Sequence, residues 1–203
     1  MQTKLKNIAY AYSGMTMRTA VDQVDDGDSK LLQGNNLSAD QSSFDASNLT
    51  KINQDSNRQT YLKHNSIVVI NRGKPVAYLF TGSESDKVIV SHLFSVIELS
   101  SETTATILPA YLVWYINNAL VAKSHFEKNS QGVHLMMTSI NTIKQLPIVI
   151  PSIAEQQQIL EREEQSINEQ ALFESLIKLR QEYNHALNQQ VITDAQQSTF
   201  VSI

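Results

Sequence analysis

The spacing of apolar and polar positions changes along the chain and separates a strand-rich part from a helical part. Up to about Ser152, short apolar runs rich in β-branched residues alternate with polar, turn-forming stretches, as is typical of strands joined by loops. In SIVVINRGKPVAYLF, the apolar runs 66–71 and 76–80 flank RGKP. Because Gly73 and Pro75 favour turns, this segment predicts a β-hairpin.

Other segments predict further strands, loops and helices. KVIVSHLFSVIEL predicts one or two more strands, whereas NNLSADQSSFDASNLTK has no period and predicts a surface loop with short structured pieces. From Pro109 to about Phe126, apolar residues recur at helical spacing, and a proline is tolerated in the first turn of a helix. TSINTIKQL predicts a short helix, and PIVIP predicts a short strand.

The stretch LPIVIPSIAEQQQIL predicts the start of a long helix. Pro151 favours an extended conformation just before it, and Ser152 with Glu155 three residues later matches a capping box. The sequence has no proline or glycine after Ser152. We therefore expect a helix from Ile153 to about Gln190, roughly 55 Å long at about 1.5 Å per residue.

This helix carries an apolar seam whose spacing is first seven and then four, three, four and four residues, with a register slip near Ala171. The pattern indicates packing against a second long helix, as in a coiled coil. A helix that folds back on its own domain is the alternative, but the Gln- and Glu-rich opposite face favours the paired helix. The seam consists of Ile153, Leu160, Ile167, Leu172, Leu176, Leu179, Tyr183 and Leu187.

Together these patterns predict an α/β (α+β) protein in three parts. Residues 1–151 form a globular domain of short strands and helices, residues 152–192 form a long coiled-coil-type helix, and residues 193–203 form a C-terminal tail. With 203 residues, the chain is long enough for one substantial domain and an appendage.

Composition narrows the functional classes. The chain has no cysteine, which excludes disulfides, thiolate metal sites and cysteine catalysis. It has no apolar stretch of membrane-spanning length and no secretory signal, so we expect a cytoplasmic protein with no membrane partner. A net charge of −4 and a sequence pI of about 5.7 argue against non-specific binding to nucleic acid, although a local basic face or a basic partner could still contact phosphates.

No catalytic motif is present. The five histidines lack metal-ligand spacing, and DQVDDGDSK lacks the spacing and the terminal glutamate of a calcium-binding loop. GxxxxGK and GxSxG motifs are absent as well. We therefore expect no catalytic residue, no bound metal and no cofactor.

Several segments, in order, resemble type I restriction–modification specificity subunits. IPSIAEQQQI is similar to the PP-L-x-E-Q-x-x-I passage that joins a target recognition domain to a long helix in that family. KLKNIAYAYSGMT, LLQGNNLS, YLKHNSIVVINRGKPVAYLF, ILPAYLVWYINN and SQGVHLMMTSINTIKQLPIVIP resemble further family segments. Two departures are Asn65-Ser66, where the family often has Gly-Asp, and Ser152, where it has a second proline.

The resemblance implies a non-catalytic specificity subunit whose partners are double-stranded DNA and DNA methyltransferase subunits. Whether a restriction subunit is a further partner stays open. Residues 1–151 would be the target recognition domain. Because full subunits carry two such domains and two long helices, this chain resembles a half-length form that pairs as a homodimer. A coiled-coil assembly protein without DNA readout is the alternative function, and an enzyme is a more distant one.

Candidate DNA-binding residues are those that suit phosphates or base edges and fall in expected loops. The hairpin turn, with two cations, is one such loop. The candidates are Thr16, Arg18, Gln33, Asn35, Asn36, Lys51, Arg58, Arg72, Lys74 and His134.

Overall fold

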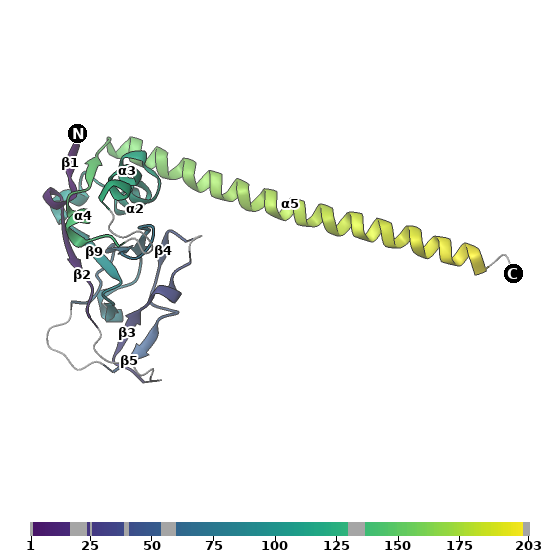
Figure 1. Ribbon diagram of the computed structural model, residues 1–203, viewed down its shortest axis with the longest axis horizontal. Coiled ribbons are helices and arrows are strands. Elements are labelled where there is room, and N and C mark those ends of the chain that lie inside the picture. Colours follow the sequence, from purple (N-terminus) through teal and green to yellow (C-terminus); the bar gives the residue numbers. More distant parts are fainter. Residues whose placement is uncertain are drawn as a thin grey trace. The chain divides into compact units, whose positions relative to one another are not determined.

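A computed structural model describes residues 2–16, 24, 26–38, 41–53, 60–129 and 137–200, with side chains given to residue 195. The chain forms two compact units, Met1–Gln157 and Gln158–Ile203. The first contains the strands and short helices, and the second contains most of one long helix, α5 (Figure 1). The mixed α/β fold class predicted from the sequence is confirmed.

A five-stranded sheet is the centre of the first unit, in the order β2-β9-β6-β7-β4. Its strands are β2 (Ala9–Ser13), β9 (Phe94–Leu99), β6 (Ile67–Ile70), β7 (Ala77–Phe80) and β4 (Ser43–Phe44). β6 and β7 pair antiparallel, which confirms the predicted hairpin. Its turn contains Gly73 at φ 82°, a left-handed conformation that glycine adopts without a steric cost.

A three-stranded sheet has the order β5-β3-β8, with β3 parallel to β8. Its strands are β5 (Thr50–Ile52), β3 (Ser29–Leu32) and β8 (Val88–Val90), with the 3₁₀ turns η2 (Gly34–Asn36) and η3 (Glu84–Asp86) nearby in the chain. Leu32, Val88 and Val90 are buried in the same apolar cluster as Phe94 and Val96 of the larger sheet. The two sheets therefore share a core.

The remaining elements lie at the start of the chain and between β9 and α5. They are β1 (Gln2–Lys4), η1 (Leu5–Asn7), α1 (Ser101–Thr104), α2 (Pro109–Asn118), α3 (Leu120–Asn129), α4 (Ile140–Lys144) and β10 (Pro147–Val149). β1 pairs antiparallel with β10, so the start of the chain lies beside the strand that leads into α5. The Tyr111 and Tyr115 hydroxyls of α2 donate to the carbonyl oxygens of Val149 and Pro147 at 2.9 and 3.0 Å.

The sequence predicts one helix from Pro109 to about Phe126, and this prediction is wrong. The helix ends at Asn118, Ala119 is extended with ψ 130°, and α3 begins at Leu120. The Asn117 side chain explains the break, because its Oδ1 accepts from the Ala77 N–H and its Nδ2 donates to the Ala77 carbonyl at 2.8 and 2.9 Å. These bonds hold the end of α2 against β7. Leu120, at the start of α3, is consequently 80% exposed.

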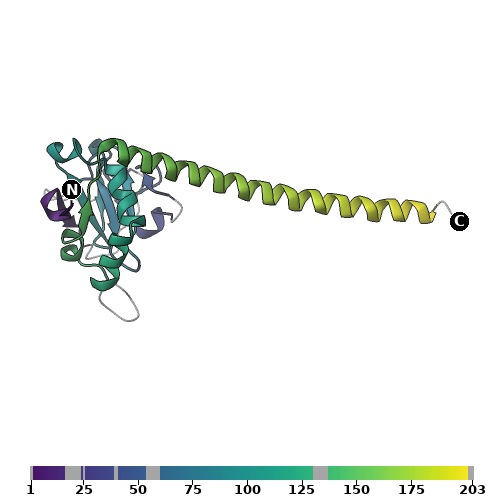
Figure 2. The same cartoon turned by 90° about the horizontal axis from the view of Figure 1, so that it is seen from above.

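α5 (Ile153–Phe200) begins where the sequence predicts, with the predicted capping box. The Ser152 N–H donates to Glu155 Oε2 at 2.8 Å, and the Glu155 N–H donates to Ser152 Oγ at 3.3 Å. The hydrogen bonds from Ser152 lower the pKa of the Glu155 carboxyl. The helix does not end near Gln190 but continues to Phe200, so most of the predicted tail is helical (Figure 2).

Gln156 fixes the first turn of α5 to its surroundings and is completely buried. Its Nε2 donates to the carbonyl oxygens of Thr106 and Pro151 at 2.8 and 2.9 Å, and its Oε1 accepts from the Leu108 N–H at 2.9 Å. The side chain therefore joins the start of α5 to the segment between α1 and α2. The sequence suggests only a glutamine-rich helix here.

The apolar residues of α5 beyond the first turns are exposed. Leu172, Leu176, Leu179, Tyr183 and Leu187 of the predicted seam are 42–69% exposed, Ile167 is 54% exposed, and Ile153 and Leu160 are partly exposed. A seam of this kind is unfavourable in water and is typical of an interaction surface. None of the described helices is both long and apolar enough to cross a membrane.

Candidate nucleic-acid interface

The turn at residues 91–93, between β8 and β9, brings together segments that are distant in sequence. The Met15 N–H donates to the Val90 carbonyl at 2.7 Å, and the His92 N–H donates to the Met15 carbonyl at 2.8 Å. Met15 and Ser91 form an isolated parallel bridge. The segment that follows β2 therefore runs beside this turn.

The β6–β7 turn joins the same place through Asn71. The Asn71 N–H donates to the Leu93 carbonyl at 2.9 Å, and its Nδ2 donates to the His92 carbonyl at 3.4 Å. The Asn71 carbonyl accepts from the Thr138 N–H at 2.8 Å, and Arg72 bridges Met137. We call residues 14–16, 71–76 and 91–93 the turn cluster.

Gly14 allows the close approach within the turn cluster. A Cβ placed at this position would lie 2.6 Å from the Val90 carbonyl oxygen and would overlap the Ser91 carbonyl as well. Both obstacles are backbone atoms, which cannot move aside as a flexible side chain could. The glycine that the sequence places before Thr16 is therefore required for packing.

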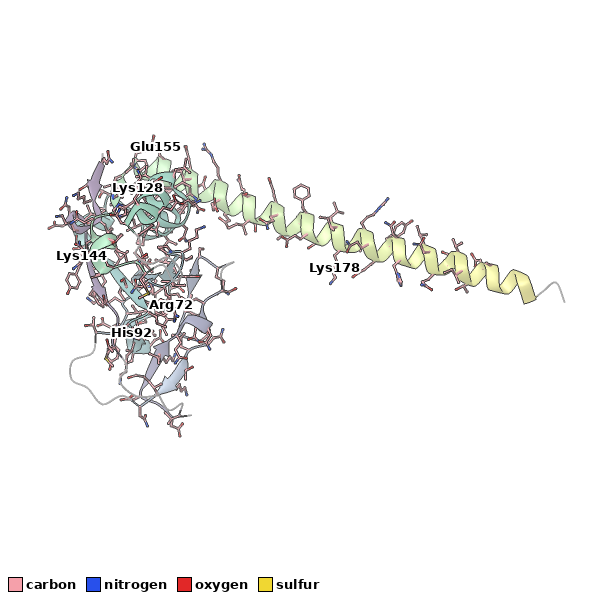
Figure 3. All side chains as sticks on the ribbon, viewed as in Figure 1. Arg72, His92, Lys128, Lys144, Glu155 and Lys178 are labelled. Atoms are coloured by element: carbon pink, nitrogen blue, oxygen red, sulfur yellow. The ribbon has the colours of Figure 1, made fainter. Side chains whose placement is uncertain are left out.

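The turn cluster is rich in donors and contains no carboxylate. Arg72, Lys74, Thr16 and His92 are all exposed, and Arg72 and His92 lie on neighbouring turns (Figure 3). Carboxylates lie instead at the opposite ends of the strands that reach the cluster, with Asp28 before β3, Asp86 before β8 and Glu98 near the end of β9. Among the described residues, such separation leaves a local surface suited to phosphate oxygens on a chain that is acidic overall.

Two of these carboxylates, Glu98 and Asp86, are paired with other groups. Lys63 Nζ lies 3.1 Å from Glu98 Oε2, and Lys30 Nζ lies 3.4 Å from Asp86 Oδ1. The Tyr12 hydroxyl donates to Glu98 Oε1 at 3.0 Å. Burial, and secondarily the Glu98 charge, raise the pKa of Tyr12 far above its usual range.

Three other predicted residues, Gln33, Asn35 and Asn36, form a segment that starts next to the turn cluster. Because β3 and β8 are parallel with Leu32 opposite Val90, Gln33 follows β3 at the end where Ser91 follows β8. The Gln33 N–H donates to Asn36 Oδ1 at 2.8 Å, and Asn36 Nδ2 donates to the Asn48 carbonyl at 3.2 Å. The Asn36 amide is thus engaged in local structure, whereas Asn35 is exposed.

The other predicted residues lie apart from the cluster or outside the described residues. Lys51 is exposed on β5, with Lys30 as its register partner. Arg18, Arg58 and His134 are not among the described residues. Of the predicted contacts, the fold therefore brings three into the turn cluster, namely Thr16, Arg72 and Lys74.

The predicted contacts did not include His92 and Asn71, two polar residues of the cluster. His92 is exposed at its centre, and Asn71, only 6% exposed, is bonded to His92 and to the Ser95 hydroxyl, which donates to Asn71 Oδ1 at 2.8 Å. The sequence did contain a signal for a turn at His92, because SHL is a polar break between two apolar runs. Within the described ranges, no three acidic or histidine side chains gather in a way that could hold a metal ion.

Comparison with known proteins agrees with this architecture. A family model described as "Type I restriction modification DNA specificity domain" matches residues 2–179. That range includes the whole turn cluster and more than half of α5. No curated protein matches the chain.

Three solved structures are similar. The type I restriction–modification S subunit from M. genitalium is 17% identical, with a TM-score of 0.51 over 91% of this chain and 44% of that chain. The HsdS subunit from Thermoanaerobacter tengcongensis is 10% identical, with a TM-score of 0.56 over 84% of this chain and 37% of that one. A structure concerned with assembly and conformational transition of the type I R-M system is 11% identical, with a TM-score of 0.59 over 83% and 39%. At these identities the likeness establishes the fold, and this chain spans less than half the length of each.

Proposed function

The chain belongs to the type I restriction modification DNA specificity domain family, and from that premise we propose that it reads DNA sequence for a partner methyltransferase. The family match over residues 2–179 is the observation that carries the proposal. The exposed donors of the turn cluster support it, because phosphates and base edges are bound by such groups. Methyl transfer, and any cleavage by a restriction subunit, belong to partner subunits.

In this proposal residues 1–151 recognise DNA and residues 152–192 form the dimerisation helix. Two copies pair through the exposed seam of α5, from Ile153 to Leu187, and form a homodimer with two recognition domains. The acidic composition fits this arrangement, since the partner subunits can supply most of the charge around the duplex. The complex would act on cytoplasmic DNA, without a cofactor held by this chain.

The pairing is tested by placing charges in the seam. Burying one leucine side chain contributes roughly 1.5–3 kcal/mol, so Leu176→Asp with Leu179→Asp should convert a dimer into monomers in light scattering at micromolar concentration. Gln181→Asp with Asn188→Asp is the matched control, because it adds the same charge to exposed positions outside the seam. A wild-type mass of one chain would contradict the homodimer while leaving pairing with a different half-subunit open.

The DNA target provides the decisive test. Two identical chains related by a two-fold axis read the same bases on opposite strands, so the site should consist of two inverted half-sites with a spacer between them. The measurement is the map of modified bases in cells that express this chain as the sole specificity component with methyltransferase subunits. An asymmetric split motif would contradict the homodimer as the reader. Assembly of the complex without any sequence-specific modification would contradict DNA reading and favour a purely structural role.

A further inference from the structure

His92 has an unusually well-fixed backbone for an exposed residue in a turn. Its N–H donates to the Met15 carbonyl at 2.8 Å, and its carbonyl accepts from Asn71 Nδ2 at 3.4 Å. Its neighbour Leu93 accepts from the Asn71 N–H at 2.9 Å. The turn is thus held from the β2 side and from the β6–β7 side at once.

Asn71 is the buried half of this arrangement. Its Oδ1 accepts from the Ser95 hydroxyl at 2.8 Å, while its Nδ2 faces the His92 carbonyl. Both ends of the amide therefore have partners inside the fold, and a satisfied buried network of this kind makes local structure rigid. Asn71 acts on the turn and not on solvent, because only 6% of it is exposed.

Polar groups that lack partners lie beside the same network. The hydroxyls of Ser91, next to His92, and of Thr138, the residue whose N–H donates to the Asn71 carbonyl, are buried and have no hydrogen-bond partner among the described residues. A buried hydroxyl left unpaired is unfavourable for folding. Each such group in a folded protein calls for an explanation, and a functional role is one of them.

His92 is exposed on the turn next to the one that carries Arg72 and Lys74, and the turn cluster contains no carboxylate. Arginine and lysine offer only donors, which suits phosphate oxygens. A neutral imidazole offers one donor and one acceptor, which suits the mixed donors and acceptors of base edges in the major groove. The three side chains therefore differ in what they can recognise.

We propose that His92 is a base-reading residue of this chain and that Asn71 is its positioning residue, while Arg72 and Lys74 bind the neighbouring phosphates. The proposal rests on the proposed DNA-reading function and identifies which side chain supplies sequence information. A rigid backbone beneath an exposed polar group reduces the entropy lost on binding, which is the usual requirement of a specificity contact.

The test uses the complex of the full chain with its methyltransferase subunits and duplexes that carry the wild-type motif. His92→Ala should weaken binding to the cognate duplex by roughly 5- to 150-fold, the range for loss of one base contact. Binding to a duplex without the motif should stay unchanged. The modification map should become tolerant at one position in each half-site, since a homodimer carries the change twice.

The matched control is His64→Gln. His64 is also exposed, but it lies near the opposite end of β6, with its Nδ1 3.2 Å from the Thr81 carbonyl oxygen. This variant should retain affinity and motif. Arg72→Ala with Lys74→Ala should weaken cognate and unrelated duplexes together and reduce the salt dependence of binding, as lost phosphate contacts do.

Three results would decide the matter. An unchanged motif and affinity in His92→Ala would overturn the proposal, and so would an equal loss on cognate and unrelated duplexes, which identifies a phosphate contact. A wild-type complex without sequence preference would instead overturn the proposed function itself.

The role of Asn71 is tested by a double-variant cycle. If Asn71 acts through His92, Asn71→Ala with His92→Ala should discriminate between duplexes no worse than His92→Ala alone. Additive losses would show that Asn71 does not act through His92. Should Asn71→Ala fail to fold, Asn71→Ser takes its place, and the His92→Ala measurement remains decisive for base reading.

Discussion

Replacing Gln156 by alanine should destabilise the first unit far more than the same replacement at the other glutamines near the start of α5. The variant removes one acceptor and two donor bonds, leaving the Leu108 N–H and the Thr106 and Pro151 carbonyls without their partner. Each unpaired buried group costs roughly 1–3 kcal/mol. Because Thr106 is exposed and its carbonyl can bind water, we take the lower end of this range. The expected loss is about 3 kcal/mol in the free energy of unfolding.

The assay is urea unfolding followed by circular dichroism at one fixed protein concentration, so that the proposed dimerisation affects all variants equally. With an m value of about 2 kcal/mol/M, the midpoint should fall by about 1.5 M. Gln157→Ala is the matched control, because it changes the same residue type at the next, exposed position of the helix. Gln156→Met separates packing from hydrogen bonding, since it restores most of the volume and none of the bonds.

The reasoning would be refuted if Gln156→Ala unfolded within about 0.5 kcal/mol of Gln157→Ala, the usual effect of a surface substitution. Full recovery in Gln156→Met would show that the buried volume, and not the amide, stabilises the turn. Neither result would bear on DNA binding, because the turn cluster shares no hydrogen bond with Gln156 among those described.

Two further predictions concern the cluster and the helix cap. Gly14→Ala should cost about 1–3 kcal/mol from overpacking against backbone and should abolish sequence-specific binding, whereas Gly34→Ala, with open space around its Cβ, should be nearly neutral in chemical denaturation. Glu155→Gln should lower the thermal midpoint at about pH 7, because the pKa of Glu155 is depressed in the folded state. The stabilisation of a carboxyl with a depressed pKa is present above its unfolded pKa and disappears as the pH falls through the folded one. The difference from wild type should therefore vanish in acid, and a difference that persists at about pH 2 would contradict the cap as its cause.

The features predicted correctly from the sequence are those determined by neighbouring residues. The β6–β7 hairpin follows from Gly73 and the apolar runs beside it, and the start of α5 follows from Ser152 and Glu155, three residues apart. Each requires only local conformation and short-range hydrogen bonds. The predicted end of α5 was too early. The helix continues to Phe200, and the sequence has no proline or glycine that would end it sooner.

The features that the sequence did not reveal depend on contacts between distant residues. α2 ends because Asn117 bonds to Ala77, forty residues earlier in the chain. The turn cluster forms because Met15 pairs beside Ser91, a contact set by strand register. Neither pairing leaves a periodic pattern in the sequence. Consequently Thr16, Arg72 and Lys74 could be nominated individually, but the central place of His92 emerged only from the fold.

The exposed seam of α5 constrains how two copies can pair. Successive residues of an α-helix are turned by about 100° around its axis. The seam residues from Leu172 to Leu187 therefore lie within an arc of roughly 80°. The step of five residues from Ile167 to Leu172, in contrast, turns the seam by about 140° around the helix. A left-handed coiled coil absorbs a drift of only about 20° per heptad. One partner helix therefore cannot follow both halves of the seam without changing sides. The half from Leu172 to Leu187 holds five apolar seam residues that are all well exposed, whereas Ile153 and Leu160 in the other half are partly covered. In the proposed homodimer, this asymmetry makes the C-terminal half the stronger pairing surface, so charges at Leu176 and Leu179 are the sharpest probe of assembly.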